Sequence, residues 1–195
     1  MSRLFPFVLA FILLAVLAVS LVVAPAKAAP RSTEAVMHEI LHDRGSPLAD
    51  IAYNAVAFRR YQGPAVDLLA MYAVAWAETN LGRDGFWAKT YNLGCIRGGS
   101  SGSPWRDWRT GTYHSFNVYA SPYMGQRAMI RLLWEASYMP LLKAHDWRGF
   151  TKRYWGGDYW THASHREDYI GNLSAAYRLL VSDGRSHGLN PTHLR

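Results

Sequence analysis

A run of ten apolar residues, Leu68 to Ala77, constrains the fold of this chain more than any other feature. The run reads L-L-A-M-Y-A-V-A-W-A, with no polar residue inside it. A helix that is apolar on every side belongs in the middle of a core rather than on a surface. We therefore predict a central helix from Val66 to Leu81, with Gly82 as the glycine that stops it.

Glu78 follows this run directly and is a lone carboxylate near the C-terminal end of the predicted helix. The negative end of the helix dipole disfavours its charge. Apolar surface from the flanking Trp76 and Leu81 is expected to disfavour ionisation further. Both effects raise the pKa of Glu78, which is the direction that a general acid needs at neutral pH. The alternative is an ordinary glutamate at a frayed helix end.

The N-terminal segment has the pattern of an export signal. Arg3 precedes the uncharged apolar run Leu4 to Val23, and Ala26-Lys27-Ala28 is a small-x-small cleavage sequence. We expect residues 1–28 to be a signal peptide or an N-terminal membrane anchor, because the run is long enough to span a bilayer if it is not cut. Residues 29–195 then form one exported domain, secreted or held in the cell envelope.

The balance of charge favours an anionic partner. The chain has 21 basic and 14 acidic residues, and loss of Arg3 and Lys27 with the signal leaves 19 against 14, a net charge of +5. Such a charge suits a cell-wall polymer or a membrane surface. The densest basic run is Arg59-Arg60 and no nucleic-acid motif is present, so we do not expect nucleic acid. We expect a monomer that uses no metal, nucleotide or other cofactor.

Cys95 is the only cysteine, so no intramolecular disulfide can form. A catalytic thiol is one interpretation, and a buried, unreactive cysteine is the commoner case.

The rest of the chain predicts helices on both sides of a small β-hairpin. Two stretches with alternating pattern, Trp105–Trp108 and Tyr113–Tyr119, are separated by Thr110-Gly111. The predicted fold class is α+β: a mainly helical domain with a small β-hairpin lobe after the helix that carries Glu78. The other predicted helices are Thr33–His42, Leu48–Tyr61, a helix opened by Ser121-Pro122 with Met124, Ala128, Leu132 and Leu133 inward, and a last helix opened by a capping box at Ser164–Glu167.

Three segments resemble the lysozyme-like superfamily, in particular its bacterial cell-wall glucosaminidase branch. They are A-V-A-W-A-E-T-N-L-G (73–82), N-L-G-C-I-R (92–97) and F-N-V-Y-A-S (116–121) with Gly125, and Arg44–Ala49 is similar to a segment found upstream in related exported proteins. The resemblance covers most of residues 44–182. It implies a lysozyme-like fold and an endo-β-N-acetylglucosaminidase that acts on peptidoglycan.

The resemblance also implies roles for particular residues. Glu78 corresponds to the general acid, and Asn92, Leu93 and Ile96 correspond to a segment that lines the sugar cleft. Gly94-Cys95 departs from the family, which usually has an aromatic residue and then glycine. Family members often carry a second carboxylate some thirty-odd positions after the first, where this chain has none.

Two kinds of residue are candidates to assist Glu78. Asp107 is the only acid of the hairpin region, and a tyrosine such as Tyr113 or Tyr119 is the alternative. Sugar sites also use flat aromatic faces and amide groups. The expected substrate-binding residues are therefore Tyr91, Asn92, Ile96, Trp105, Tyr113 and Tyr119. The alternative is that these aromatic residues pack a small lobe that lacks aliphatic ones.

These observations predict a glycosidase that protonates the leaving oxygen of a β-1,4 bond. The second catalytic role falls to a carboxylate or to the acetamido oxygen of the substrate. A lytic transglycosylase, which also works with one glutamate, and a glycan-binding module without activity are alternatives.

His38-Glu39-Ile40-Leu41-His42 matches the zinc-protease motif H-E-x-x-H. Leu48 occupies the position at which the longer metzincin pattern has its third histidine. A histidine-rich helix face explains the motif better than a zinc site does.

Overall fold

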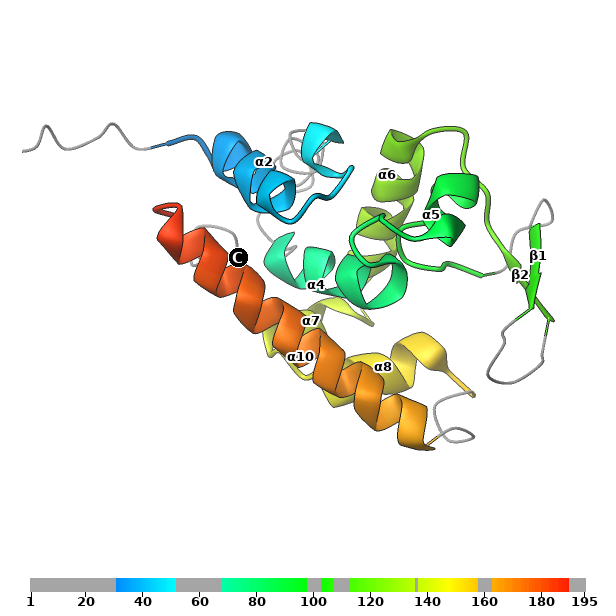
Figure 1. Ribbon diagram of the computed structural model, residues 1–195. Helices are drawn as coiled ribbons and strands as arrows, with labels where there is room; N and C mark the ends of the chain where they lie inside the picture. Colours follow the sequence, from blue (N-terminus) through cyan, green and yellow to red (C-terminus); the bar gives the residue numbers. More distant parts are fainter. Residues whose placement is uncertain are drawn as a thin grey trace, which may run out of the picture. The chain divides into compact units, whose positions relative to one another are not determined.

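The computed structural model describes residues 31–51, 68–97, 103–106, 113–135, 137–157 and 163–189 (Figure 1). Within these ranges, none of the helices has the length and apolar character needed to cross a membrane. The apolar run Leu4–Val23 lies outside them, as does most of the predicted helix Leu48–Tyr61, of which the 3₁₀ turn η1 (Ala49–Ile51) is described.

Helices make up most of the described residues, so the predicted mainly helical character is confirmed. They are α2 (Thr33–Asp43), α4 (Leu68–Thr79), α5 (Gly85–Thr90), α6 (Pro122–Leu133), α7 (Met139–Lys143), α8 (Trp147–Trp155) and α10 (Ala163–Ser186).

Helix α4 lies at the centre of the core, as the apolar run predicts. Every residue from Leu68 to Ala75 is fully buried. The long helix α10 packs along α4 and also contacts α2 and α8 (Figure 1). Helix α6 contacts α4 as well. Because α4 is covered by several elements, it needs no polar face.

Two short strands, β1 (Ser103–Arg106) and β2 (Tyr113–Phe116), pair in antiparallel register with Trp105 opposite His114. Phe116 also forms an isolated antiparallel bridge with Arg97, which brings the end of β2 to the segment after Asn92. The predicted turn at Thr110-Gly111 lies outside the described residues. One pair of four-residue strands is a small β-element in a helical structure and does not by itself define an α+β lobe.

The inward face predicted for α6 is confirmed at Leu133, whereas Ala128 and Leu132 are only half-buried and the prediction is wrong at Met124. Met124 is 45% exposed, whereas Gly125, Gln126, Met129, Ile130 and Leu133 are buried. Gln126 is buried because its Nε2 donates a hydrogen bond to the hydroxyl of Tyr72 at 3.2 Å. Residue type alone misplaced the face, since a glycine and a glutamine are buried for tertiary reasons. The predicted cap is confirmed: Ser121 caps α6 and Pro122 is its first residue.

The capping box predicted at Ser164–Glu167 is not formed. Helix α10 begins at Ala163, and the Glu167 carboxylate bonds instead to Arg148 of α8 at 2.6 and 3.0 Å. A bidentate pair with an arginine on another helix competes with a local cap.

Gly125 permits the close approach of α6 to the segment after α5. A Cβ added at Gly125 would lie 1.6 Å from the carbonyl oxygen of Tyr91. We expect Gly125→Ala to lower the free energy of unfolding by about 1–3 kcal/mol, because the backbone must shift to relieve the overlap. Denaturant unfolding measures this change.

Gly171→Ala in α10 is the matched control, because a Cβ there meets nothing within 4 Å. The same substitution in an open helical position is expected to stabilise the protein by up to about 1 kcal/mol. Equal stability of Gly125→Ala and the wild type would contradict the close approach.

Candidate active site

The Glu78 carboxylate lies in the last turn of α4 and meets α10. Its Oε1 accepts a hydrogen bond from the hydroxyl of Tyr169 at 2.5 Å. Tyr169 is almost fully buried, and its ring packs against Trp155 with centroids 4.8 Å apart. Glu78 itself is only partly buried. One carboxyl oxygen is therefore held by a fixed phenol, on a side chain that is not closed off from solvent.

The pKa of Glu78 is raised above its ordinary value, chiefly because burial disfavours the charged form. The nearby negative charge of Asp84 acts in the same direction, while the Tyr169 hydroxyl, the Cys95 thiol and the positive charge of Arg97 oppose it. The direction predicted from the sequence is thus confirmed. A carboxyl group that is kept protonated can donate a proton at neutral pH.

Trp76 does not supply the apolar surface beside the Glu78 carboxyl that its sequence position indicates. Residues 76 and 78 lie about 200° apart around a helix with 3.6 residues per turn. The Trp76 ring lies instead under the guanidinium of Arg44, 4.8 Å from its centroid. Adjacency in the sequence therefore does not place the Trp76 ring against Glu78.

The backbone adopts an uncommon conformation two residues after Glu78, where α4 has ended. Asn80, Leu81 and Gly82 all have positive φ, at 51°, 56° and 77°. Left-handed backbone at the two non-glycine residues costs roughly 1–2 kcal/mol each.

Hydrogen bonds hold this turn in place. Arg83 donates to the backbone oxygen of Asn80 at 3.0 Å and to its Oδ1 at 2.6 Å. The Ser46 hydroxyl donates to the Leu81 oxygen at 2.7 Å. Helix α4 consequently ends at Thr79, three residues before the glycine that was expected to stop it, and the Glu78 side chain is set by a fixed turn rather than a frayed end.

The loop from Asn92 to Arg97 lies beside Glu78. The Cys95 thiol lies 3.7 Å from the backbone oxygen of Glu78, and Cys95 has a positive φ of 48°. Burial raises the pKa of Cys95 well above its ordinary value, with the negative charge of Glu78 acting in the same direction. Cys95 therefore stays a thiol, which argues against a catalytic thiolate.

Tyr154 of α8 fixes the same loop. Its hydroxyl donates a hydrogen bond to the backbone oxygen of Gly94. A Cβ at Gly94 would lie 2.7 Å from that hydroxyl, so the glycine makes room for the tyrosine. Burial raises the pKa of Tyr154 well above its ordinary value, and the negative charge of Glu78 acts in the same direction.

Asn92 is a structural residue in this arrangement. Its side chain is fully buried, with Nδ2 donating to the oxygens of Ile96 and Asn117 and Oδ1 accepting from the Ile96 nitrogen at 2.8 Å. These bonds use both amide donors and place the carbonyl oxygen inside the loop. The predicted contact of the Asn92 amide with a sugar is therefore corrected, because the amide holds the loop in shape.

The other predicted binding residues lie around the same loop. Tyr91 and Ile96 are half-buried and pack against the core, and Tyr91 forms an edge contact with Trp87 at 5.7 Å. Tyr119 is half-buried, with its backbone nitrogen bonded to the Thr90 oxygen at 2.8 Å. Trp105 and Tyr113 lie on β1 and β2, where the structure describes the backbone alone, and Asp107 lies outside the described residues.

Sequence reasoning missed the partners that α8 and α10 supply. Tyr154 and Tyr169 lie 76 and 91 positions after Glu78, and nothing in the local sequence around either tyrosine indicates a contact with the Glu78 region. Asp84, whose Oδ1 caps α5 by accepting from the Trp87 nitrogen at 2.8 Å, was also missed. Its position between two helices was the only available signal.

The H-E-x-x-H motif lies on the exposed side of α2. The rings of His38 and His42 stack with centroids 5.8 Å apart, and both residues are exposed. Glu39 pairs with Arg31 and lies 3.2 Å from His187. Among the described residues, no group of three histidine, cysteine or acidic side chains is placed to bind a metal ion. The arrangement favours the histidine-rich face over the zinc-protease interpretation.

No protein-family model, no curated protein and no solved structure matches this chain. The assignment of a function therefore depends on the chemistry of the residues around Glu78.

The raised pKa of Glu78 has a consequence for stability. The folded protein binds the Glu78 proton more tightly than the unfolded chain does. The stabilisation of the fold by this proton is fully present below the ordinary carboxyl pKa of 4.5 and is lost as the pH rises through the folded pKa. We expect Glu78→Gln to raise the melting temperature at pH 7, with the difference vanishing near pH 3.5. For a domain of this size, 1 kcal/mol corresponds to about 2–4 °C.

Glu167→Gln is the control for this measurement. The pKa of Glu167 is lowered, first by its bonds to Arg148 and then by Arg166, so its contribution is present at neutral pH and is lost in acid. The control variant should not gain stability at pH 7. A Glu78→Gln variant that melts below the wild type at pH 7 would contradict the raised pKa.

Proposed function

We propose that this protein is an exported glycosidase that cleaves β-1,4 bonds in the glycan strand of peptidoglycan, on a lysozyme-like fold, with Glu78 as general acid. The observation that carries the proposal is the Glu78–Tyr169 pair: a partly buried carboxyl with a raised pKa, held at one oxygen by a phenol. The resemblance around Glu78 names the substrate class, and the basic charge of the chain suits an anionic wall polymer.

The geometry accounts for the acid step. Since the Tyr169 hydroxyl donates to Oε1, the proton of the neutral acid resides on Oε2. That proton passes to the glycosidic oxygen as the bond to the sugar carbon breaks and positive charge develops on the ring. The Tyr169 hydrogen bond orients the carboxyl, and the Arg83 contacts fix the turn at Asn80 that ends its helix, so the proton is transferred from a fixed position.

The second catalytic role distinguishes a hydrolase from a lytic transglycosylase. Among the described residues, Asp84 is the acidic residue whose charge acts on Glu78, and its carboxylate already caps α5. This favours a single-glutamate mechanism, in which the acetamido group of the substrate assists or an anhydro sugar forms. A second carboxylate at Asp107 is the alternative.

Loss of activity in Glu78→Gln is the first test. We expect the full-length protein to release fragments from purified peptidoglycan and the variant to be slower by about 10²–10⁴-fold, the usual contribution of general acid catalysis. Mass spectrometry of the new ends separates reducing sugars from anhydro sugars. Wall binding by the variant is the control, and activity that survives in Glu78→Gln would sink the proposal.

Tyr169→Phe tests the acid role through the pH dependence. The Tyr169 hydrogen bond stabilises the carboxylate and lowers the pKa of Glu78, so its removal raises that pKa. The protonated acid then persists to higher pH, and the basic limb of the kcat/KM profile should move upward.

Tyr177→Phe on the same helix serves as the control, because its ring packs against His145 and Trp147. The control profile should match the wild type. A basic limb that stays in place in Tyr169→Phe would show that Glu78 is not the group that titrates.

A further inference from the structure

The largest basic excess among the described residues lies on one stretch of structure, from α6 to α8. Between Pro122 and Gly157 there are six basic and two acidic residues, whereas residues 31–51 have two against four and residues 163–189 have three against three. The six basic residues are Arg127, Arg131, Lys143, Arg148, Lys152 and Arg153. The charge suited to an anionic partner is thus localised rather than spread over the chain.

Apolar side chains are exposed at the start of the same stretch. Among the described residues, the large hydrophobic side chains that stand exposed are Val118, Tyr123, Met124 and Leu179, at 41%, 40%, 45% and 45%. Three of these four fall within seven consecutive positions that end in the first turn of α6. Such local concentration on a surface is a mark of an interaction site.

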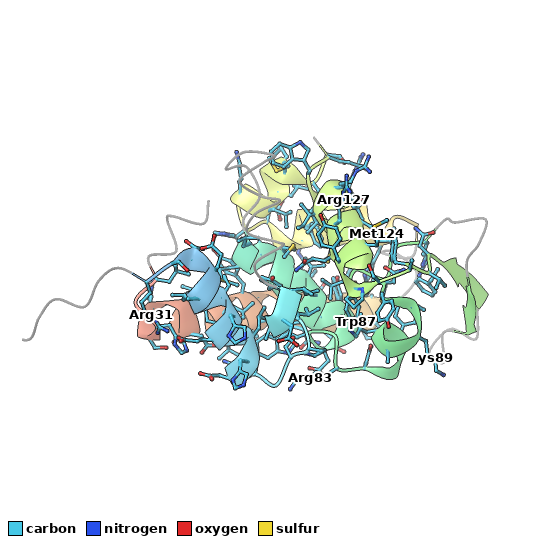
Figure 2. The ribbon with its side chains drawn as sticks, turned by 90° about the horizontal axis from the view of Figure 1, so that it is seen from above. Arg31, Arg83, Trp87, Lys89, Met124 and Arg127 are labelled. Carbon is cyan, nitrogen blue, oxygen red and sulfur yellow. The ribbon has the colours of Figure 1, made fainter. Side chains whose placement is uncertain are left out.

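The two features meet on the outer side of α6. Met124, Arg127 and Arg131 follow one another at helical spacing, opposite the buried residues Gln126 and Met129. Figure 2 shows Met124 and Arg127 beside each other on this helix. We call Val118, Tyr123, Met124, Arg127 and Arg131 the α6 surface.

This surface is connected to the Glu78 site by packing. Tyr119, next to Val118, lies against the first turn of α6, where a Cβ at Gly125 would be 3.4 Å from its ring. The Tyr119 hydroxyl accepts a hydrogen bond from Asn117, whose backbone oxygen is held by Asn92. Tyr119 thus lies between the first turn of α6 and the Asn92 loop, whose Cys95 thiol is 3.7 Å from the backbone oxygen of Glu78.

We propose that the α6 surface binds the acidic peptides attached to the peptidoglycan glycan strand. This inference rests on the proposed function, since it takes the wall polymer as the substrate. A short peptide with free carboxylates matches both features, because its carboxylates pair with Arg127 and Arg131 and its apolar side chains contact Tyr123 and Met124. A neutral glycan would use the aromatic residues but not the arginines.

Binding of the full-length protein to purified peptidoglycan tests this proposal, in a Glu78→Gln background that prevents cleavage. We expect Arg127→Glu/Arg131→Glu to weaken binding at least tenfold. The matched control is Arg178→Glu/Arg185→Glu, which makes the same change of charge at two exposed positions of α10. The control should change binding less than threefold.

Peptidoglycan with amidated carboxyl groups identifies the ligand chemistry. On this material, the wild-type surface and the Arg127→Glu/Arg131→Glu variant should bind equally. Tyr123→Ala/Met124→Ala should weaken binding to both materials by a few-fold. Equal weakening by the α10 control, or a loss on charge reversal that persists after amidation, would overturn the proposal.

Two further outcomes separate this inference from the proposed function. Cleavage by the wild type without any effect of the α6 variants sinks the inference and leaves the glycosidase. Absence of cleavage with carboxyl-dependent binding sinks the glycosidase and leaves the α6 surface as a wall-binding site. Charge reversal that leaves wall binding intact but abolishes binding to phosphatidylglycerol vesicles overturns the peptide assignment in favour of a membrane surface.

Discussion

The burial of α4 on every side is the constraint on which the rest of the structure depends. A helix whose residues from Leu68 to Ala75 have no exposed surface must be enclosed by other elements, and α10, α6 and the segments around them supply that enclosure. Burial of apolar side chains stabilises a fold by about 25 cal/mol per Å². The same enclosure fixes the direction in which the helix ends, and so the place of Glu78.

The candidate site lies at the C-terminal end of this apolar helix. Apolar side chains are stable when buried in a core, whereas a carboxyl group at the edge of the core loses hydration and binds its proton more tightly. Among the described residues, the neutral Tyr169 hydroxyl donates a hydrogen bond to the Glu78 carboxylate, and the Cys95 thiol and the positive charge of Arg97 oppose the rise in pKa only in part. Three consecutive left-handed residues follow, held by Arg83 and Ser46. Strained backbone beside a perturbed carboxyl is the combination that functional sites display more often than structural ones.

The tyrosines and the Asn92 loop have different roles around Glu78. Asn92 and Tyr154 hold the loop by donating their side-chain N–H and O–H groups to backbone oxygens. Tyr169 instead acts on Glu78 directly. Tyr91 and Tyr119 are half-buried beside the Asn92 loop, and we propose that they and the exposed side chains of α6 contact the polymer.

The sequence by itself determined the central helix, α2, the Ser121–Pro122 start of α6, and the raised pKa of Glu78, because each follows from a local pattern of polarity, capping or chain position. It failed at Met124 on the predicted inward face of α6, at the capping box of α10 and at the position of the Trp76 ring, where contacts with residues distant in the chain outweighed the local preference. The tertiary structure alone decided that Tyr169 meets Glu78 and that Asn92 serves the loop. Hydrogen bonds between residues far apart in the chain leave no periodicity in the sequence, since they depend on how helices pack rather than on which residues are neighbours.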